Sequence, residues 1–293
     1  RGLGDVYKRQ VGGGAAVSFD MGGTLGFLLG SGSGSATTQS DSVIMNVGAK
    51  SATAALMGGG IAVADANGKN NGSASSTAKF VELNFEGPKA LNENDKAKLH
   101  KAATTYLPKF REDIKSQDFS QLVADFTGFA DQVDIPGVHV ANLGGGSAIA
   151  RGYFVDDEAT GTATANSKVD SVSMTFNGGY NVATAAGGLA VAHDKADASK
   201  AANQTNATAN VDKVNLIITG GENILFTAGG LAYSTAEKRD GASLAKATAN
   251  VGSAEVLVSG GTIDGLLGGG IAFDNVNGKA TNAVANTESV TIE

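Results

Sequence analysis

The stretch Val214-Asn215-Leu216-Ile217-Ile218, followed by one residue and then by Gly220-Gly221, decides the fold because it recurs along the chain. Comparable stretches occupy residues 172–176 and 254–258, and each is again followed by one residue and a Gly-Gly pair. About nine residues later a second Gly-Gly pair introduces another apolar stretch. These second stretches begin at residues 189, 231 and 271, which are 42 and 40 positions apart. The chain is therefore a tandem array with a period of about forty residues.

Further copies of parts of this repeat are visible along the chain. The tetrapeptide Ala-Thr-Ala-Asn precedes each of the three stretches, and we expect its asparagines to be equivalent: Asn166, Asn210 and Asn250. Residues 43–47 and 58–63 resemble the two apolar parts of one earlier, less regular repeat. Residues 81–85 open another repeat, whose second glycine stretch arrives almost fifty residues late because a segment has been inserted.

Both ends of the chain differ from the repeat. Residues 1–10 share nothing with it, and residues 5–10 resemble one reading frame of a transposase adapter used in DNA library preparation. We therefore exclude residues 1–10 from the fold as an artefact. A new repeat starts at Val290 and stops at Glu293, so the chain is expected to be a fragment of a longer protein.

Within each stretch the apolar residues alternate, which is typical of a β-strand with one buried face. One strand cannot bury this face alone, but equivalent strands of successive repeats can stack into a parallel sheet. The predicted inward columns are Val172–Val214–Ala254, Met174–Leu216–Val256 and Phe176–Ile218–Val258. The Gly-Gly pairs mark the corners.

We therefore predict an all-β fold, a parallel β-helix or β-solenoid with repeats of about forty residues and a small α-helical insertion. The sequence leaves open whether each repeat supplies one rung of this stack or two. A propeller also uses forty-residue repeats, but its antiparallel four-stranded blades need turn and aromatic signatures that are missing here.

Residues 88–138 form the insertion, since they contain all three prolines, only two glycines and 15 of the 51 charged residues. Their periodicity predicts two or three short helices packed as a hairpin. One apolar face comprises Leu99, Ala103, Tyr106, Leu107, Phe110 and Ile114, and the other comprises Phe119, Leu122, Val123, Phe126, Ala130 and Val133. Asn94, and Asp118 or Ser116, are the predicted N-caps. Pro108 is expected to break or kink the first helix, and Gly128 to weaken the second.

The predicted organisation is thus repeats over residues 11–87, the helical insertion over 88–138 and repeats again over 139–293. Two interpretations of the insertion remain. Its helices either cover part of the stack with their apolar faces turned to each other, or they project from one face as a recognition element.

Composition excludes several function classes. The net charge is −7 and no basic stripe is present, which argues against nucleic acid as a partner. No run of 18 apolar residues occurs, so no membrane-spanning helix is predicted. The absence of cysteine suits a chain that crosses membranes unfolded as well as a cytosolic chain.

The chain offers no clear catalytic, cofactor-binding or metal-binding residues. His100, His139 and His193 lie in unrelated settings, namely a helix, the return from the insertion and a polar turn. The glycine-rich runs 30–34 and 265–270 lack the Gly-Lys-Ser/Thr of a phosphate loop, and the second recurs as a repeat corner.

Acidic and amide residues cluster in four turns, and oxygen-rich turns of this kind can hold calcium. These turns lie at residues 65–68, 156–158, 193–194 and 274–278. They lack the spacing of calcium-binding β-rolls, and the backbone demands of Asn-Gly turns explain them without a cation.

Right-handed β-helices include polysaccharide lyases and hydrolases, which place paired carboxylates on one outer face. In this chain the outward acids Glu82, Asp170 and Glu255 belong to different repeats. Glu82 and Glu255 could align along one face, where solvated edge charge is the simpler interpretation.

The alternating strand, the Gly-Gly pair, the Gly-Gly-Gly-Ile-Ala of residues 58–62 and 268–272 and the Ala/Thr/Asn-rich return together resemble the passenger region of bacterial autotransporters and related surface adhesins. The resemblance covers about 190 residues. It implies a non-enzymatic, secreted β-helical stalk displayed at the surface of a Gram-negative cell. An outer-membrane barrel translocator and host or cell-surface glycans or proteins are the implied partners. A carbohydrate-active β-helix enzyme is the alternative.

Overall fold

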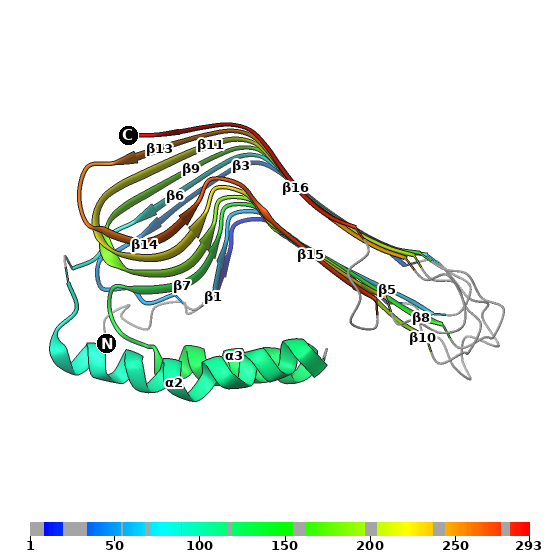
Figure 1. Cartoon of the computed structure of the whole chain (residues 1–293), viewed down its shortest axis with the longest axis horizontal. Helices are drawn as coiled ribbons and strands as arrows, with labels where there is room; N and C mark the ends of the chain where they lie inside the picture. Colours follow the sequence, from blue (N-terminus) through cyan, green and yellow to red (C-terminus); the bar gives the residue numbers. More distant parts are fainter. Residues whose placement is uncertain are drawn as a thin grey trace.

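The computed structural model shows two parallel β-sheets and a helical hairpin (Figure 1). It describes residues 9–19, 34–53, 55–67, 71–88, 90–116, 119–154, 162–196, 204–236, 244–276 and 282–293. The elements are β1 Arg9–Val11, β2 Ala15–Phe19, β3 Gly34–Val47, β4 Ala55–Met57, β5 Ile61–Asn67, β6 Gly72–Phe85, α2 Glu93–Ser116, α3 Phe119–Gln132, β7 Val138–Leu143, β8 Ser147–Phe154, β9 Thr162–Ala185, β10 Leu189–Ala196, β11 Gln204–Thr227, β12 Leu231–Ala236, β13 Leu244–Val258, β14 Thr262–Leu267, β15 Ile271–Val276 and β16 Ala283–Ile292. The prediction of a mostly β, parallel fold is confirmed.

The larger sheet has ten strands and the smaller has six, in the order β15-β12-β10-β8-β5-β2. Among the described strands every pairing is parallel, which is not the antiparallel pairing of propeller blades. Residues 9 and 10, expected to be an artefact, belong to β1 and pair with β4, whereas residues 1–8 lie outside the described part.

Each repeat contributes one rung to the stack, which answers the question that the sequence leaves open. Leu189 pairs directly with Leu231, and Leu231 with Ile271, so nothing intervenes between positions one full repeat apart. A rung consists of a long strand that turns at the first Gly-Gly pair, a shorter segment, and a third strand after the second glycine corner. Figure 1 shows the rungs stacked, with a wide body at one end and a long two-layered arm at the other. The arm is the part in which the six-stranded sheet faces the first halves of the long strands.

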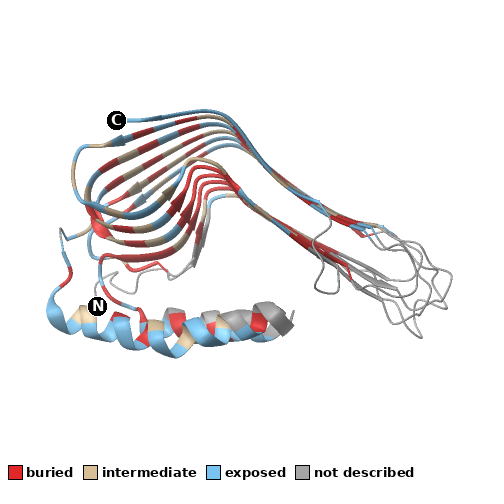
Figure 2. Cartoon of the chain, viewed as in Figure 1, coloured by how far each residue is buried: buried red, intermediate tan, exposed pale blue. Residues whose placement is uncertain are grey.

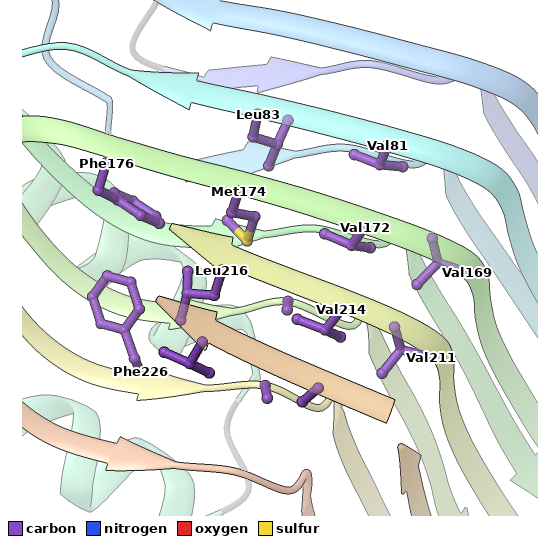
Figure 3. Close-up of a cluster of buried hydrophobic side chains, with 14 of the residues drawn as sticks. Val81, Leu83, Val169, Val172, Met174, Phe176, Val211, Val214, Leu216 and Phe226 are labelled. Atoms are coloured by element: carbon purple, nitrogen blue, oxygen red, sulfur yellow. The ribbon is translucent and has the colours of Figure 1, made fainter. Parts of the chain in front are cut away.

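The three predicted columns are confirmed. Val214 pairs with Val172 and Ala254, Leu216 with Met174 and Val256, and Ile218 with Phe176 and Val258. All of these side chains are buried except that of Val258, which is partly buried. Figure 3 shows Val172, Met174, Phe176, Val214 and Leu216 of these columns side by side in the core, and Figure 2 shows the alternation of buried and exposed residues along the strands. The rings of Phe85 and Phe176 stack at 4.6 Å between centroids and extend the column to an earlier rung.

The arm has a different core, made of small side chains. Alanines from both layers form it, including Ala62, Ala148, Ala190 and Ala232 of the smaller sheet and Ala74, Ala165, Ala207 and Ala247 of the long strands. Serines next to them hydrogen-bond across the two layers. Ser167 Oγ donates to the carbonyl of Gly146 at 2.9 Å, and Ser76 Oγ to that of Gly60 at 2.8 Å. The Ala- and Gly-rich composition is therefore a requirement of close layer packing.

The expected equivalence of the three Ala-Thr-Ala-Asn copies is wrong for the first copy. Asn210 pairs with Asn250 but also with Lys168, whereas Asn166 lies opposite Thr208. Asn166 precedes Val172 by six positions, whereas Asn210 precedes Val214 by only four. The buried valines Val172 and Val214 pair directly in this register, and the partly buried Asn166 is therefore offset from Asn210 by two residues.

The insertion folds into two helices that pack against each other. α2 begins two residues earlier than expected, with Asn92 rather than Asn94 as its N-cap, because Asn92 Oδ1 accepts from the backbone N–H of Asp95 at 3.0 Å and Asn92 Nδ2 donates to Asp95 Oδ2 at 2.8 Å. Of the other predicted caps, Asp118 lies outside the described residues, and Ser116 is the last residue of α2.

Of the two other expectations about these helices, a break at Pro108 is wrong, whereas the weakening of α3 by Gly128 stays a prediction. α2 continues through Pro108, which faces solvent, so water can bind the carbonyl of Thr104 that proline leaves without an N–H donor. Gly128 lies inside α3, where a Cβ would come within 2.5 Å of the Tyr106 hydroxyl oxygen. The glycine therefore allows Tyr106 of α2 to lie against α3.

The insertion enters the stack at a corner. Gly137 has φ +83°, like the second glycine of the corners in the later rungs, Gly179 (+84°), Gly221 (+83°) and Gly261 (+82°). Gly87 takes the place of the first glycine, since a Cβ on it would lie 2.4 Å from Gly179 Cα. A Cβ on Gly137 would in turn lie 2.4 Å from Pro88 Cδ, so the insertion leaves and returns at one point. The helices thus split a single Gly-Gly pair.

Deleting residues 88–136 is therefore expected to preserve the rungs, because it joins Gly87 to Gly137 and restores the corner found at Gly220-Gly221. Circular dichroism should lose its helical component and retain its β component. Stability should fall modestly, since Val138 and Val140 lose their cover. Loss of the β signal would show that the hairpin is needed for the stack to fold.

The second glycine corner gives a sharper test. A Cβ on Gly187 would lie 2.4 Å from the backbone nitrogen of Gly230 in the next rung. Gly187→Ala is therefore expected to destabilise the chain by about 1–3 kcal/mol, because neighbouring backbones must move apart. Gly14→Ala is the matched control, since nothing lies within 4 Å of a Cβ there. Equal urea midpoints for the two variants would contradict the close stacking of corners.

Candidate functional site

The three histidines do not meet. His100 is exposed on α2, and His139 is fully buried in β7. His193 lies within β10 rather than in the expected polar turn, because β10 extends to Ala196, and its Nδ1 lies 2.6 Å from Thr235 Oγ1 on the next rung. Among the described residues no group of three or more His, Asp or Glu is placed to hold a metal ion.

The glycine-rich runs and acidic turns fall partly outside the described residues. Residues 30–33 and 156–158 lie outside, while residues 268–270 form the corner between β14 and β15. Of the acidic residues in these turns, only Asp274 has a described side chain. Asp274 is buried, and its Oδ2 accepts from the backbone N–H of Asn282.

Glu82 and Glu255 do lie in one outward column, but not on adjacent rungs. Ser173 and Asn215 stand between them. Three rung spacings separate the two strands by about 14 Å, which is wider than the 5–9.5 Å that separates the two carboxyl groups of glycosidases. These two residues therefore do not form a catalytic carboxylate pair.

Asp170, the third of the outward acids, belongs to a charged column on the outside of the long strands. Lys168 Nζ lies 2.9 Å from Asp170 Oδ1 and 3.6 Å from Asp212 Oδ2 on the next rung, and Lys79 lies 2.6 Å from Asp41. A hydrogen bond from Lys79 lowers the pKa of Asp41. The column is exposed, so its ion pairs contribute little to stability.

A buried polar column runs through the body where the insertion returns. It consists of Thr53, His139, Asn181 and Asn223, one residue per rung. Thr53 Oγ1 lies 3.2 Å from His139 Nδ1, and Asn181 Nδ2 donates to Asn223 Oδ1 at 2.9 Å. Burial lowers the pKa of His139 to about 4. The imidazole is therefore neutral at neutral pH, and the column is structural.

The hairpin covers the outer face of β7. Leu99, Ala102, Phe129 and Val133 of the helical segment form one buried cluster with Val138 and Val140, against which Tyr180 and Val182 of the next rung are partly buried. Val138 and Tyr180 are paired in one column of the stack, and Val140 and Val182 in another. In the next two rungs the first column continues with Glu222 and Thr262, and the second with Ile224 and Asp264. Both columns therefore carry apolar residues where the helices cover them and become polar on the rungs that lie beyond the helices.

A groove of about 330 Å³ lies where this cover ends, and we call it the α2 groove. It is lined by Lys96, Leu99, His100, Ala103, Tyr180 and Glu222. Sequence reasoning missed it, because Tyr180 and Glu222 occupy ordinary repeat positions and only the path of α2 makes a wall beside them.

A second concavity, of about 450 Å³, lies at the base of the insertion between Ala49, Pro88, Leu91 and Pro136. Its remaining lining residues are Gly87, Ala90, Asn92 and Asp95. Asn92 and Asp95 already hydrogen-bond to each other as the α2 cap. The α2 groove is therefore the better candidate for a binding site.

Comparison with protein-family models, curated proteins and solved structures finds no match for this chain. Neither described helix is long and apolar enough to cross a membrane. The function must therefore be argued from the rungs and from the surfaces that they display.

Proposed function

We propose that the chain is a β-solenoid stalk of a secreted or cell-surface bacterial protein, of the kind found in autotransporter passengers and adhesins, and that it displays binding surfaces without catalysing a reaction. The observation that supports this proposal most directly is the uninterrupted stack of rungs. Columns such as Val81–Val172–Val214–Ala254 continue from rung to rung in register. A stack of this kind grows in length by adding repeats, which suits a spacer that carries a surface away from a cell.

The position of the hairpin also supports the proposal. The insertion is attached at a single corner and packs on the outer face, so the columns continue past it. A stalk can carry such an outer element without cost to its core. In this proposal the hairpin and the rung faces beside it are the displayed surface, and host or cell-surface glycans or proteins are its partners.

The alternative of a carbohydrate-active enzyme gains no specific support from Glu82 and Glu255, which are too widely spaced to act together. The outward acids Asp170 and Asp212 lie on adjacent rungs, but both contact Lys168. We therefore propose the stalk alone.

Surface display can be tested with an antibody raised against the chain. We expect the antibody to label intact cells of the source organism as strongly as permeabilised cells. Labelling that appears only after permeabilisation would overturn the proposed location. In parallel, incubation of the purified chain with a panel of polysaccharides should release no new reducing ends or unsaturated products, and their release would favour the enzyme.

A further inference from the structure

We propose that the α2 groove binds a neutral saccharide, a proposal that rests on the proposed function and names the ligand class of the displayed surface. The groove is formed by two elements that are remote in sequence. Lys96, Leu99, His100 and Ala103 have the i, i+3, i+4, i+7 spacing of one face of α2, and Tyr180 and Glu222 come from successive rungs. Its volume lies at the lower end of the range of small-ligand sites.

The sheet side of the groove offers both hydrogen-bond donors and acceptors. Glu222 supplies a carboxylate, which only accepts. Burial, with the nearby carboxylates of Glu222 and Asp264, raises the pKa of Tyr180, so its hydroxyl stays protonated and can both donate and accept. Sugar hydroxyl groups also donate and accept, and a carboxylate can take two of them at once.

The α2 side supplies apolar contact and little free positive charge. Ala103 and the half-buried Tyr180 ring offer a surface for the C–H groups of a sugar ring, to which Leu99, 8% exposed, adds little. Lys96 Nζ lies 3.3 Å from Glu93 Oε1 on its own helix, so its charge is partly compensated. With Glu222 facing the same space, an anionic ligand would be repelled, and a neutral saccharide fits better than an acidic one.

The test uses the full chain, labelled and applied to an array of neutral and acidic oligosaccharides. Binding to neutral oligosaccharides is expected, and the affinity of the strongest one is then measured by calorimetry for three variants. Glu222→Gln and Tyr180→Phe keep the size of each side chain and should each weaken binding about tenfold. Glu255→Gln makes the same charge change on another outer face and should leave the affinity unchanged.

Each outcome is informative, provided that the variants show the thermal unfolding of the unchanged chain. Saccharide binding that neither groove variant weakens would overturn the groove as the site while leaving the displayed stalk intact. Binding confined to acidic oligosaccharides, or no binding at all, would overturn the neutral-saccharide assignment. The antibody labelling of intact cells decides the proposed function separately, so the two failures are distinguishable.

Discussion

Leu216→Asp should unfold the rungs around β11. Leu216 is 1% exposed and lies between Met174 and Val256 in the central column of the body (Figure 3). The substitution removes a buried leucine side chain, which typically costs about 2–5 kcal/mol, and places an unpaired carboxylate in the core at a further cost of several kcal/mol. Since whole domains are stable by only about 5–15 kcal/mol, most of the β signal in circular dichroism should be lost.

The matched control is Asn215→Asp, one residue earlier on the same strand. Asn215 is exposed on the opposite face, so this substitution should change the free energy of unfolding by about 0.5 kcal/mol or less. If Leu216→Asp unfolded at the same urea concentration as the control, the central column would not be buried.

Acid should destabilise the chain through His139. Its pKa is about 4 in the folded protein and 6.5 as a free side chain, so the unfolded chain binds a proton that the folded chain does not. The stability held by the neutral imidazole is fully present above about pH 6.5 and is lost as the pH falls toward 4. The difference between the two pKa values corresponds to about 3 kcal/mol. Urea denaturation at several pH values between 7.5 and 4 measures this loss.

His139→Asn isolates this contribution. Asparagine would continue the polar column of Asn181 and Asn223 without a titrating group, although the ring contact with Phe85, 5.3 Å between centroids, would be lost. The variant should therefore lose less stability than the unchanged chain between pH 6.5 and 4. His100→Asn, on the exposed face of α2, should keep the original pH profile. Identical profiles for His139→Asn and the unchanged chain would show that His139 is not buried in its neutral form.

Much of the fold could be predicted from the sequence, because residues that are one repeat apart in the sequence are paired on neighbouring strands. The alternation around Val214 and Leu216 identified the buried face, and the glycine pairs identified the corners. The same signal was present but overlooked for the buried polar column, since His139, Asn181 and Asn223 are each 42 positions apart. The number of rungs per repeat was not predictable, because strands of similar composition could pair at half the period.

Other features depend on contacts that no local pattern reports. The displacement of Asn166 follows from the pairing of the buried Val172 with Val214, which leaves the partly buried asparagine two residues out of register with Asn210. Asn92, rather than Asn94, caps α2 because its side chain and that of Asp95 satisfy each other. The α2 groove arises only where the hairpin cover ends, between residues separated by more than 70 positions, such as Ala103 and Tyr180.

One rung per repeat is the central claim, and disulfide cross-linking tests it most directly because the chain has no cysteine of its own. Asn210 and Asn250 are paired on adjacent strands, and the side chain of Asn250 donates to that of Asn210 at 2.7 Å. Cysteines at these two positions lie about 4.8 Å apart, within the range that a disulfide bridges. Cysteines at Asn166 and Asn210 are two residues out of register, about 8 Å apart, and should not cross-link. Rapid oxidation of the Asn210/Asn250 pair alone is the predicted result. Failure of that pair to cross-link, or equal cross-linking of the Asn166/Asn210 pair, would contradict the register and with it the single-rung stack.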